Sequence, residues 1–359
     1  MGELLNEAKR PVKMMDNEEY TLVTVKRRNE GVLPRGMFKG KDILVKNYFE
    51  IKSGDFLISK RQVVHGANGI VPKSLDGAIV SNEYLASTDN EKISVNFLAL
   101  LSKRPEMYKL FFLSSYGVDI EKLVFDVEDW KKRTIYVPTI KEQETISNFF
   151  HTLDDTITLY KRKLDKLKEL KKGYLQQMFP QAGESVPRVR FAGYTGDWEE
   201  RKLGEVLKVN SGRDYKHLND GEIPVYGTGG YMLSVDESLS EIDAIGIGRK
   251  GTIDKPQLLA APFWTVDTLF FMTPTPKNDL LFLYALSEIV EWAKMDESTG
   301  VPSLSKLNIQ NIDVCVPEES EQTAIGKFFR TLDEQVASQQ AKLDKLKQLK
   351  TAYLQKMFV

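Results

Sequence analysis

The sequence predicts an α/β protein (α+β) in which two mixed α/β domains are joined by two long antiparallel coiled-coil helices. Two observations support this fold class. A long segment with a helical apolar period occurs twice, once in each half of the chain. The segment before each copy consists of short runs rich in Val, Ile, Phe and Tyr, separated by Gly, Pro, Asn and Asp. The predicted pseudo-two-fold order is a domain at 1–136, a helix at 137–180, a linker at 181–187, a domain at 188–315 and a helix at 316–359.

The composition is that of a globular protein. The chain has 359 residues, of which 42% are hydrophobic and 28% charged, so each domain can bury a core. Cys315 is the only cysteine, which excludes internal disulfides and multi-cysteine zinc sites and fits a reducing cytoplasm. We expect no signal peptide and no membrane span, because the most apolar stretch, residues 280–293, is too short. The net charge of −1 does not favour nucleic-acid binding, so any DNA-binding surface must be local.

The two repeat copies predict the helices. Residues 137–179 and 316–358 align without a gap at an offset of 179 (316 − 137), with about half of the positions identical. Pro138 and Pro317 precede the helices, where a missing N–H is tolerated. Apolar residues recur at steps of mostly three and four, as in Leu153, Ile157, Tyr160, Leu164 and Leu167 of the first copy and Leu332, Val336, Leu343 and Leu346 of the second. Neither copy can bury this stripe alone, so we expect the two helices to pack antiparallel, with Gln339 interrupting the seam.

The two domains share one short pattern. Residues 55–61 and 243–249 each run from an aspartate through a short strand to an arginine, Arg61 or Arg249. An arginine beside a glycine-containing loop can hold a guanine edge through two hydrogen bonds, although a surface hairpin whose arginine pairs with a local carboxylate remains the alternative. The candidate DNA-contacting residues are Arg35, Lys60, Arg61, Gln62, His65 and Asn68 in the first domain and Arg213, Tyr215, Tyr226, Thr228, Arg249, Lys250, Thr252, Thr299 and Ser303 in the second.

No enzyme motif was found in the sequence. Residues 246–251 read G-x-G-x-x-G, but a dinucleotide site needs a helix to begin at this loop, and Pro256 follows with no helical period. The three histidines, His65, His151 and His217, have no spacing typical of metal ligands. We therefore predict no catalytic residues and no metal site in this chain.

Several motifs together resemble those of one protein family. The motif P-x-x-R-F-x-G-x-x-G-x-W-x-x-x-K-L-G-E runs from Pro187 to Glu205, and the helix start P-x-x-x-E-Q-x-x-I-x-x-F-F-x-x-L-D occurs twice. The second domain adds Y-G-T-G-G, G-R-K-G-T and S-T-G-V-P-S-L-S. Over essentially its whole length the sequence resembles the specificity subunit of type I restriction–modification enzymes. The long motif has one departure: residues 1–4 align with residues 203–206, so the part that bears Trp198 has no first copy.

The resemblance implies a function and a set of partners. It implies a non-catalytic, cytoplasmic subunit of a bacterial or archaeal cell, whose two target recognition domains each read one half of a bipartite asymmetric site in double-stranded DNA. The helices would set the gap and dock two modification (methyltransferase) subunits, and restriction subunits that translocate DNA would join them. S-adenosylmethionine, ATP and Mg are then expected on the partner subunits, with no cofactor in this chain. The candidate docking residues are Glu142, Gln143, Phe149 and Phe150 in the first helix and Glu321, Gln322, Phe328 and Phe329 in the second.

Two other classes of function fit the sequence less well. A coiled-coil adaptor without DNA specificity would explain the helices, but it would not need two divergent domains of similar size with Arg- and Gly-bearing loops. A self-contained methyltransferase or nuclease would need motifs that the sequence lacks.

Overall fold

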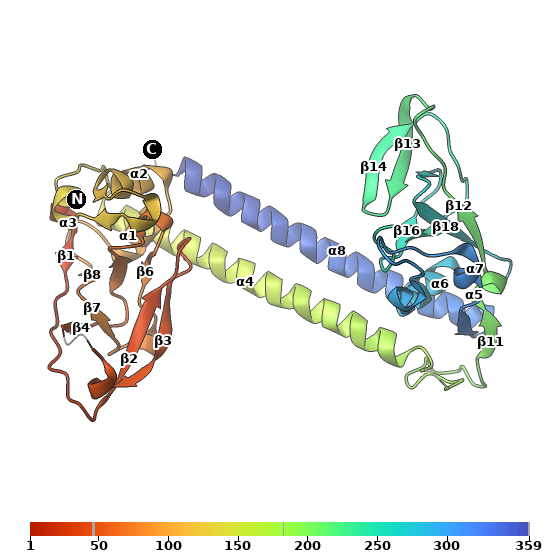
Figure 1. Ribbon diagram of the computed structural model, residues 1–359, viewed down its shortest axis with the longest axis horizontal. Helices are drawn as coiled ribbons and strands as arrows, with labels where there is room; N and C mark the ends of the chain where they lie inside the picture. Colours follow the sequence, from red (N-terminus) through yellow and green to blue (C-terminus); the bar gives the residue numbers. More distant parts are fainter. Residues whose placement is uncertain (45–46, 182, 358–359) are drawn as a thin grey trace. The chain divides into compact units, whose positions relative to one another are not determined.

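The computed structural model describes residues 1–44, 47–181 and 183–357. Val45, Lys46, Ala182, Phe358 and Val359 lie outside the described residues, and with them the predicted end of the second helix at residue 359. The chain divides into unit 1, residues 1–158 with 345–359, and unit 2, residues 159–344. Each unit contains one mixed α/β domain and part of each of two long helices, α4 (Ile140–Gln177) and α8 (Glu319–Lys356) (Figure 1).

Each domain is built on an antiparallel sheet with the same connectivity. The strand order is β1-β8-β5-β6 in unit 1 and β12-β18-β15-β16 in unit 2. The strands are β1 (Asn6–Glu7), β5 (Phe56–Ser59), β6 (Asn68–Ile70), β8 (Tyr84–Thr88), β12 (Leu207–Ser211), β15 (Ala244–Gly248), β16 (Gln257–Leu259) and β18 (Leu269–Pro274). Strands β5 and β15 begin directly after Asp55 and Asp243, so the short shared sequence pattern marks equivalent strands.

A second sheet in each domain also follows one plan. Its order is β3-β2-β7-β4 in unit 1 and β14-β13-β17 in unit 2, with the pairs β2–β7 and β13–β17 parallel. The strands are β2 (Glu19–Val25), β3 (Val32–Lys39), β4 (Tyr48–Glu50), β7 (Ile79–Ser81), β13 (Asp220–Gly227), β14 (Gly230–Val235) and β17 (Trp264–Thr265). The domains therefore share a topology even though their sequences have diverged.

Short helices complete each domain. The equivalent helices α1 (Val95–Leu101) and α6 (Leu280–Ser287) each begin at a capping side chain: Ser94 accepts from the Phe97 amide and Asp279 from the Phe282 amide. The other helices are α2 (Pro105–Leu113), α3 (Val127–Lys131), α5 (Leu203–Val206) and α7 (Lys306–Gln310). The 3-10 helices are η1 (Gly2–Leu4), η2 (Gly40–Asp42), η3 (Val63–His65), η4 (Lys73–Leu75), η5 (Ile120–Lys122) and η6 (Trp292–Met295).

Two further strand pairs distinguish the units. In unit 1, β9 (Ser115–Tyr116) pairs with β10 (Val124–Phe125). In unit 2, β11 (Glu199–Lys202) pairs antiparallel with β19 (Asp313–Val316), the strand that leads into α8. The equivalent residues ahead of α4, 134–137, form no strand.

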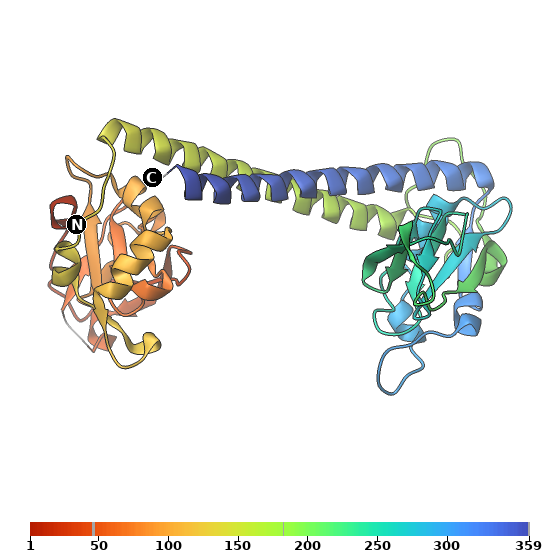
Figure 2. The same ribbon diagram turned by 90° about the horizontal axis from the view of Figure 1, so that it is seen from above.

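The long helices pack antiparallel and lie side by side within each unit (Figure 2). In unit 1, the Phe149 and Tyr353 rings meet edge to face with centroids 5.1 Å apart. In unit 2, the repeat-equivalent pair Phe328 and Tyr174 does the same at 5.0 Å. These paired contacts confirm the predicted antiparallel coiled coil and its pseudo-two-fold repeat.

Ion pairs and one polar residue also follow the repeat. Lys350 pairs with Asp154 in unit 1, and the equivalent Lys171 pairs with Asp333 in unit 2. Gln339, which interrupts the apolar stripe, is buried and donates to the Tyr160 carbonyl oxygen at 3.4 Å. Residues 160 and 339 are equivalent positions of the two repeat copies, so the Gln339 side-chain amide bonds α8 to the position of α4 that matches its own.

Candidate nucleic-acid interface

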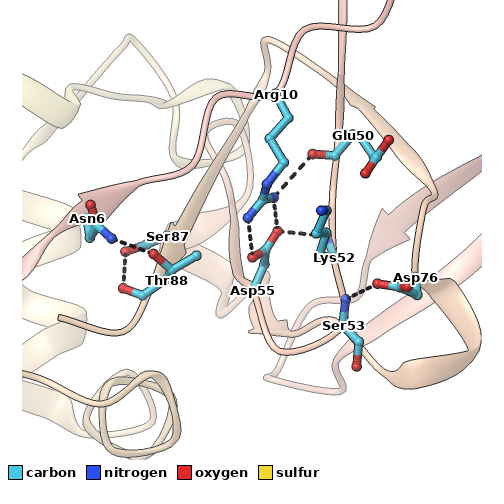
Figure 3. A network of polar contacts seen from close by, with 9 residues as sticks. All are labelled: Asn6, Arg10, Glu50, Lys52, Ser53, Asp55, Asp76, Ser87 and Thr88. Carbon is cyan, nitrogen blue, oxygen red and sulfur yellow. Dashed lines mark hydrogen bonds and ion pairs between the residues drawn. The ribbon is translucent and has the colours of Figure 1, made fainter.

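A polar network centred on Asp55 fixes the start of β5, the strand that leads into the loop of Lys60, Arg61 and Gln62. The buried Asp55 carboxylate accepts two hydrogen bonds from the Arg10 guanidinium, at 2.6 and 3.1 Å, and one from the Lys52 amide at 2.8 Å (Figure 3). The Asp55 carboxylate raises the pKa of Arg10. Its unit 2 counterpart, Asp243, instead accepts from the Ala261 amide at 2.8 Å. Both aspartates therefore hold the base of a strand whose far end leads into a candidate DNA-contacting loop.

The loop after β5 presents the predicted basic side chains with local partners. Arg61 donates to Glu83 at 2.6 Å, and this partner lowers the pKa of Glu83. The Lys60 ammonium donates to the Asn82 carbonyl oxygen at 2.8 Å. For Arg61 the local-carboxylate alternative is thus the one found in this structure. Because exposed ion pairs contribute about 0–1 kcal/mol, a DNA phosphate could replace Glu83 at little cost.

A basic hollow of about 700 Å³ opens beside this loop. Arg27 bridges two partners in it, donating to Gln62 and to Glu121 at 2.6 Å each. His65 Nε2 lies 3.6 Å from the same Glu121 carboxylate. The other charged side chains that line the hollow are all basic: Arg28, Lys103 and Arg104. Basic groups outnumber the one lining carboxylate, so the hollow suits an anionic ligand such as a phosphate backbone.

The backbone around the hollow is held in an unusual conformation. Arg28 and Asn29 have φ angles of 58° and 56°, a region that residues other than glycine rarely adopt. The Arg28 amide donates to the His65 carbonyl oxygen at 2.7 Å and the Asn29 amide to Gly66 at 2.8 Å. These bonds hold the exposed Arg28 side chain next to the loop after β5.

One unit 1 prediction is contradicted by the structure, and another lies on a different element. Asn68 is only 2% exposed and accepts from the Ser102 hydroxyl at 2.6 Å, so it joins β6 to α1 and is wrong as a DNA contact. Arg35 is exposed on β3 and does not line the hollow; Lys60, Arg61 and Gln62 do not line it either, but those three lie in the loop after β5. Sequence reasoning missed Lys103 and Arg104, which reach the hollow from the turn between α1 and α2 and have no sequence motif.

In unit 2 two of the predicted loops meet directly after the end of β15. The Arg249 amide donates to the Thr268 carbonyl oxygen at 2.8 Å, and Lys250 forms a β-bridge with Ser303. The Gly251 amide donates to the Pro302 carbonyl oxygen at 2.9 Å, which ties the loop of Thr299 and Ser303 to that of Arg249 and Lys250. Both basic side chains are exposed, and the Arg249 guanidinium lies 5.8 Å from the Phe270 ring centroid.

A second hollow, of about 730 Å³, lies beside these loops. Tyr215 and Thr228 line it, as do Lys216, Tyr231, Asp214 and Asp267. Tyr226 packs edge to face on Tyr231, with ring centroids 6.5 Å apart. The Arg213 side chain is exposed, while the backbone of Arg213 is hydrogen-bonded to Trp264 and Thr265 of β17. Thr252 is half-buried, and its carbonyl oxygen packs closely against Gly248. The two domains thus present different chemistry from topologically equivalent loops.

One organising residue of unit 2 was not predicted. The Asp296 carboxylate accepts from the amides of Ser298 and Ser303 at 2.9 Å each, and these bonds lower the pKa of Asp296. The carboxylate therefore closes the loop that carries Thr299 and Ser303. An aspartate two residues before a serine is a common turn pattern, which is the only sequence signal it offers.

The candidate docking residues on the helices fall into two groups. Gln143 is buried and bonds to the Ser94 amide at 3.0 Å and the Pro138 carbonyl oxygen at 2.9 Å. Gln322 is its repeat equivalent, with the Asp279 amide at 3.0 Å and Pro317 at 2.9 Å. Both glutamines fasten a long helix to the cap of α1 or α6.

The docking prediction is therefore corrected for five of the eight residues. Besides the two glutamines, Phe150 and Phe329 are each 1% exposed and belong to the domain cores, and Glu321 is fully buried against Arg190. Side chains that are buried and satisfied within the chain cannot also contact a partner in this conformation. Glu142 and Phe149 are exposed and Phe328 is half-buried, so these three stay available as predicted contacts.

The described residues hold no group of three or more potential metal-binding side chains. The G-x-G-x-x-G stretch is followed by a strand: β15 ends at Gly248 and the next element is β16. Among the described residues, none of the helices is both long and apolar enough to span a membrane.

Comparisons with known proteins identify the family. The profile described as "Type I restriction modification DNA specificity domain" matches residues 1–169 and 195–348. The specificity subunit of the Escherichia coli type I restriction enzyme EcoDI is 24% identical over 156 residues, covering 43% of this chain and 35% of that protein. The Methanocaldococcus jannaschii MjaVIII specificity subunit is 22% identical over 237 residues, covering 55% of each. The chain thus spans about a third to a half of these curated relatives.

Solved structures agree on the fold. The type I restriction–modification S subunit from M. genitalium superposes with a TM-score of 0.65 at 17% identity, covering 100% of this chain and 94% of that one. A chain from work on complex assembly and conformational transition of the type I R-M system gives 0.55 at 17% identity, covering 99% and 95%. The chain therefore belongs to the family of type I restriction–modification specificity subunits, which are non-catalytic.

Proposed function

We propose that the chain reads a bipartite asymmetric site in double-stranded DNA, with each domain reading one half. One observation carries this proposal: two domains of the same topology place different polar loops after the equivalent strands β5 and β15. Equivalent frames with unlike loops are what a protein needs to read two unlike half-sites. Arginine is suited to this task because its guanidinium can bind guanine through two hydrogen bonds.

The residues proposed to contact DNA lie in the loops described above. In unit 1 these are Arg28 and His65, which line the basic hollow, and Lys60, Arg61 and Gln62 in the loop after β5. In unit 2 the main contacts are Arg249 and Lys250, with Arg213, Tyr215, Tyr226, Thr228, Thr252, Thr299 and Ser303 on the neighbouring loops. The net charge of −1 means that attraction to phosphate must come from these local clusters.

The helices are proposed to set the gap between the half-sites and to dock two modification subunits. Phe149 and Phe328 occupy equivalent positions of the repeat, each beside a tyrosine of the other helix, so one partner surface could bind twice. Restriction subunits would complete the complex in the cytoplasm of a bacterial or archaeal cell. S-adenosylmethionine, ATP and Mg would then be bound by those partners, with no cofactor in this chain.

Single arginine variants test whether the two domains read separately. We expect Arg28→Ala and Arg249→Ala each to relax the sequence preference at one half-site by roughly 5- to 150-fold, the effect of losing a contact worth about 1–3 kcal/mol. The measurement is selection of binding sites from random duplexes by the chain assembled with its modification subunit. Lys73→Ala and Lys306→Ala remove the same charge from exposed positions outside both hollows and serve as matched controls.

Other outcomes would separate the alternatives. Weaker binding to every sequence alike would assign the arginine to a phosphate contact. If neither variant changed sequence preference while the modification subunit still bound the chain, the adaptor function without DNA specificity would be favoured.

A further inference from the structure

In unit 2, one lysine links both long helices to the domain. Lys171 of α4 donates to the Glu288 carboxylate at 2.8 Å and also pairs with Asp333 of α8. Glu288 is the residue that directly follows α6. The three side chains are half-buried and form a closed set, in which one cation is shared by two carboxylates.

Two of these three side chains recur in unit 1. Lys350 and Asp154 are the repeat equivalents of Lys171 and Asp333, since 350 − 171 and 333 − 154 are both 179. They form the same ion pair between α8 and α4. The long helices therefore present the same lysine–aspartate pair to each domain.

The third position carries the opposite charge in unit 1. Lys103 lies nine residues after Ser94, the cap of α1 (103 − 94). Glu288 likewise lies nine residues after Asp279, the cap of α6 (288 − 279). The charges that act on the Lys103 ammonium are those of the lysine–aspartate pair of unit 1, so it takes the place that Glu288 has in unit 2. Unit 1 thus combines two lysines with one carboxylate, where unit 2 combines one lysine with two.

The charge of Lys103 is left uncompensated. Its ammonium makes no ion pair within the described part of the chain, and the nearby Asp154 carboxylate is bound to Lys350. Burial lowers the pKa of Lys103, the charge of Lys350 lowers it further, and Asp154 raises it. The residue keeps an exposed surface, so it stays charged near neutral pH. An anion bound here would relieve the repulsion between the two lysines.

Lys103 also lines the basic hollow of unit 1. Three other basic side chains of this hollow already lie beside a carboxylate: Arg27, His65 and Arg104. Arg28 and Lys103 are the lining cations that have no ion pair among the described residues. Glu288 does not line the hollow of unit 2. At this position, a cation that faces a hollow is therefore a feature of unit 1.

We propose that Lys103 binds a DNA phosphate in unit 1 and that Glu288 excludes the equivalent contact in unit 2. This inference rests on the proposed DNA-reading function and adds to it a contact that only one half-site receives. An ammonium suits such a contact, because it is a compact charge with three rotatable donors and needs no fixed geometry. Phosphate contacts position the duplex and carry no sequence information.

The salt dependence of DNA binding tests the contact. Binding of labelled duplexes of random sequence to the chain assembled with its modification subunit is followed by fluorescence anisotropy between about 50 and 200 mM salt. Lys103→Gln should reduce the slope of log K against log[salt] by about 0.9, the value for one phosphate contact, and weaken binding roughly five- to tenfold at about 0.1 M salt. Lys109→Gln removes a lysine from an exposed position of α2 outside the hollow and should change neither quantity. An unchanged slope for Lys103→Gln would overturn the proposal.

Charge reversal separates this contact from folding. Lys103→Glu gives unit 1 the charges that unit 2 has at the same positions, so the variant should unfold at the temperature of the parent chain or above it. It should nevertheless bind DNA more weakly than Lys103→Gln, because it adds a repulsion for phosphate. A melting temperature below that of Lys103→Gln, or DNA binding as strong as that of the parent, would contradict the proposal.

Ethylation interference tests whether the contact belongs to one half-site. On a duplex that carries the selected site, ethylation of a phosphate beside the half-site that Arg28→Ala affects should inhibit binding of the parent complex. With Lys103→Gln this signal should disappear, while the signals at the other half-site persist. Loss of signals at both half-sites, or at neither, would overturn the assignment to unit 1. A parent complex that bound no duplex would overturn the DNA-reading function as well, so the two failures are distinguishable.

Discussion

Removing Arg190 should destabilise unit 2 far more than removing Glu142 destabilises unit 1. Glu321 has no solvent exposure, and two of its hydrogen bonds come from Arg190, whose side chain is 14% exposed. Deleting one partner of a buried ion pair costs about 3–5 kcal/mol, because it leaves an uncompensated charge. Partial exposure of Arg190 places Arg190→Ala at the lower end, about 3 kcal/mol. Glu142 is exposed, so Glu142→Ala should change the unfolding free energy by less than about 0.5 kcal/mol.

Hydrogen exchange measured by mass spectrometry under native conditions suits this comparison, because the two units need not unfold in one transition. Arg190→Ala should lower protection in β11, β19 and the start of α8, and it should lower the melting temperature of unit 2 by about 6–12 °C. The double variant with Glu321→Gln should recover part of the loss, since it removes the unpaired buried charge. A cost below about 1 kcal/mol for Arg190→Ala, or an equal cost for Glu142→Ala, would refute the claimed asymmetry between the repeats.

Three further variants probe the frame that carries the loops. Gln143→Leu should cost about 1–3 kcal/mol, because the Ser94 amide loses its buried acceptor, and urea unfolding should show it. Gln339→Leu should stabilise the coiled coil, because a polar side chain in an apolar seam lowers stability, and thermal unfolding measures the rise. Burial raises the pKa of Glu288 above its ordinary value of 4.5, despite the Lys171 partner. Above pH 4.5 the native state therefore binds more protons at this carboxylate than the unfolded chain does. The contribution of Glu288 to the unfolding free energy then falls as pH rises. Glu288→Gln should therefore gain stability relative to the parent chain as pH rises through that window, and an unchanged difference would contradict the assignment.

The helices were predictable because their signals are local and repeated. A period of three to four residues and a second copy 179 positions later (316 − 137) fix the helices and their antiparallel pairing. The sheet orders were not predictable, since strand partners such as β2 and β7 are far apart in sequence and their pairing depends on the whole domain.

The candidate sites show the limits of sequence patterns more clearly. Arg249, Lys250 and Ser303 come together because their loops follow strands of one domain. Asn68 and Gln143 are polar residues near such loops or in a repeated motif, but both are buried and bonded within the chain. Identity between two repeat copies does not distinguish a residue that packs a helix from one that contacts a partner, since both roles are duplicated.

The central claim is that two unlike domains on one helical spacer read a divided site. The most direct measurement is the pattern of adenine methylation across the host genome when the chain is expressed with its modification subunit. Two short half-motifs separated by a fixed gap are predicted, because each domain reads one half and the helices set the spacing. A single continuous motif, or methylation that is unchanged when the chain is absent, would contradict the account.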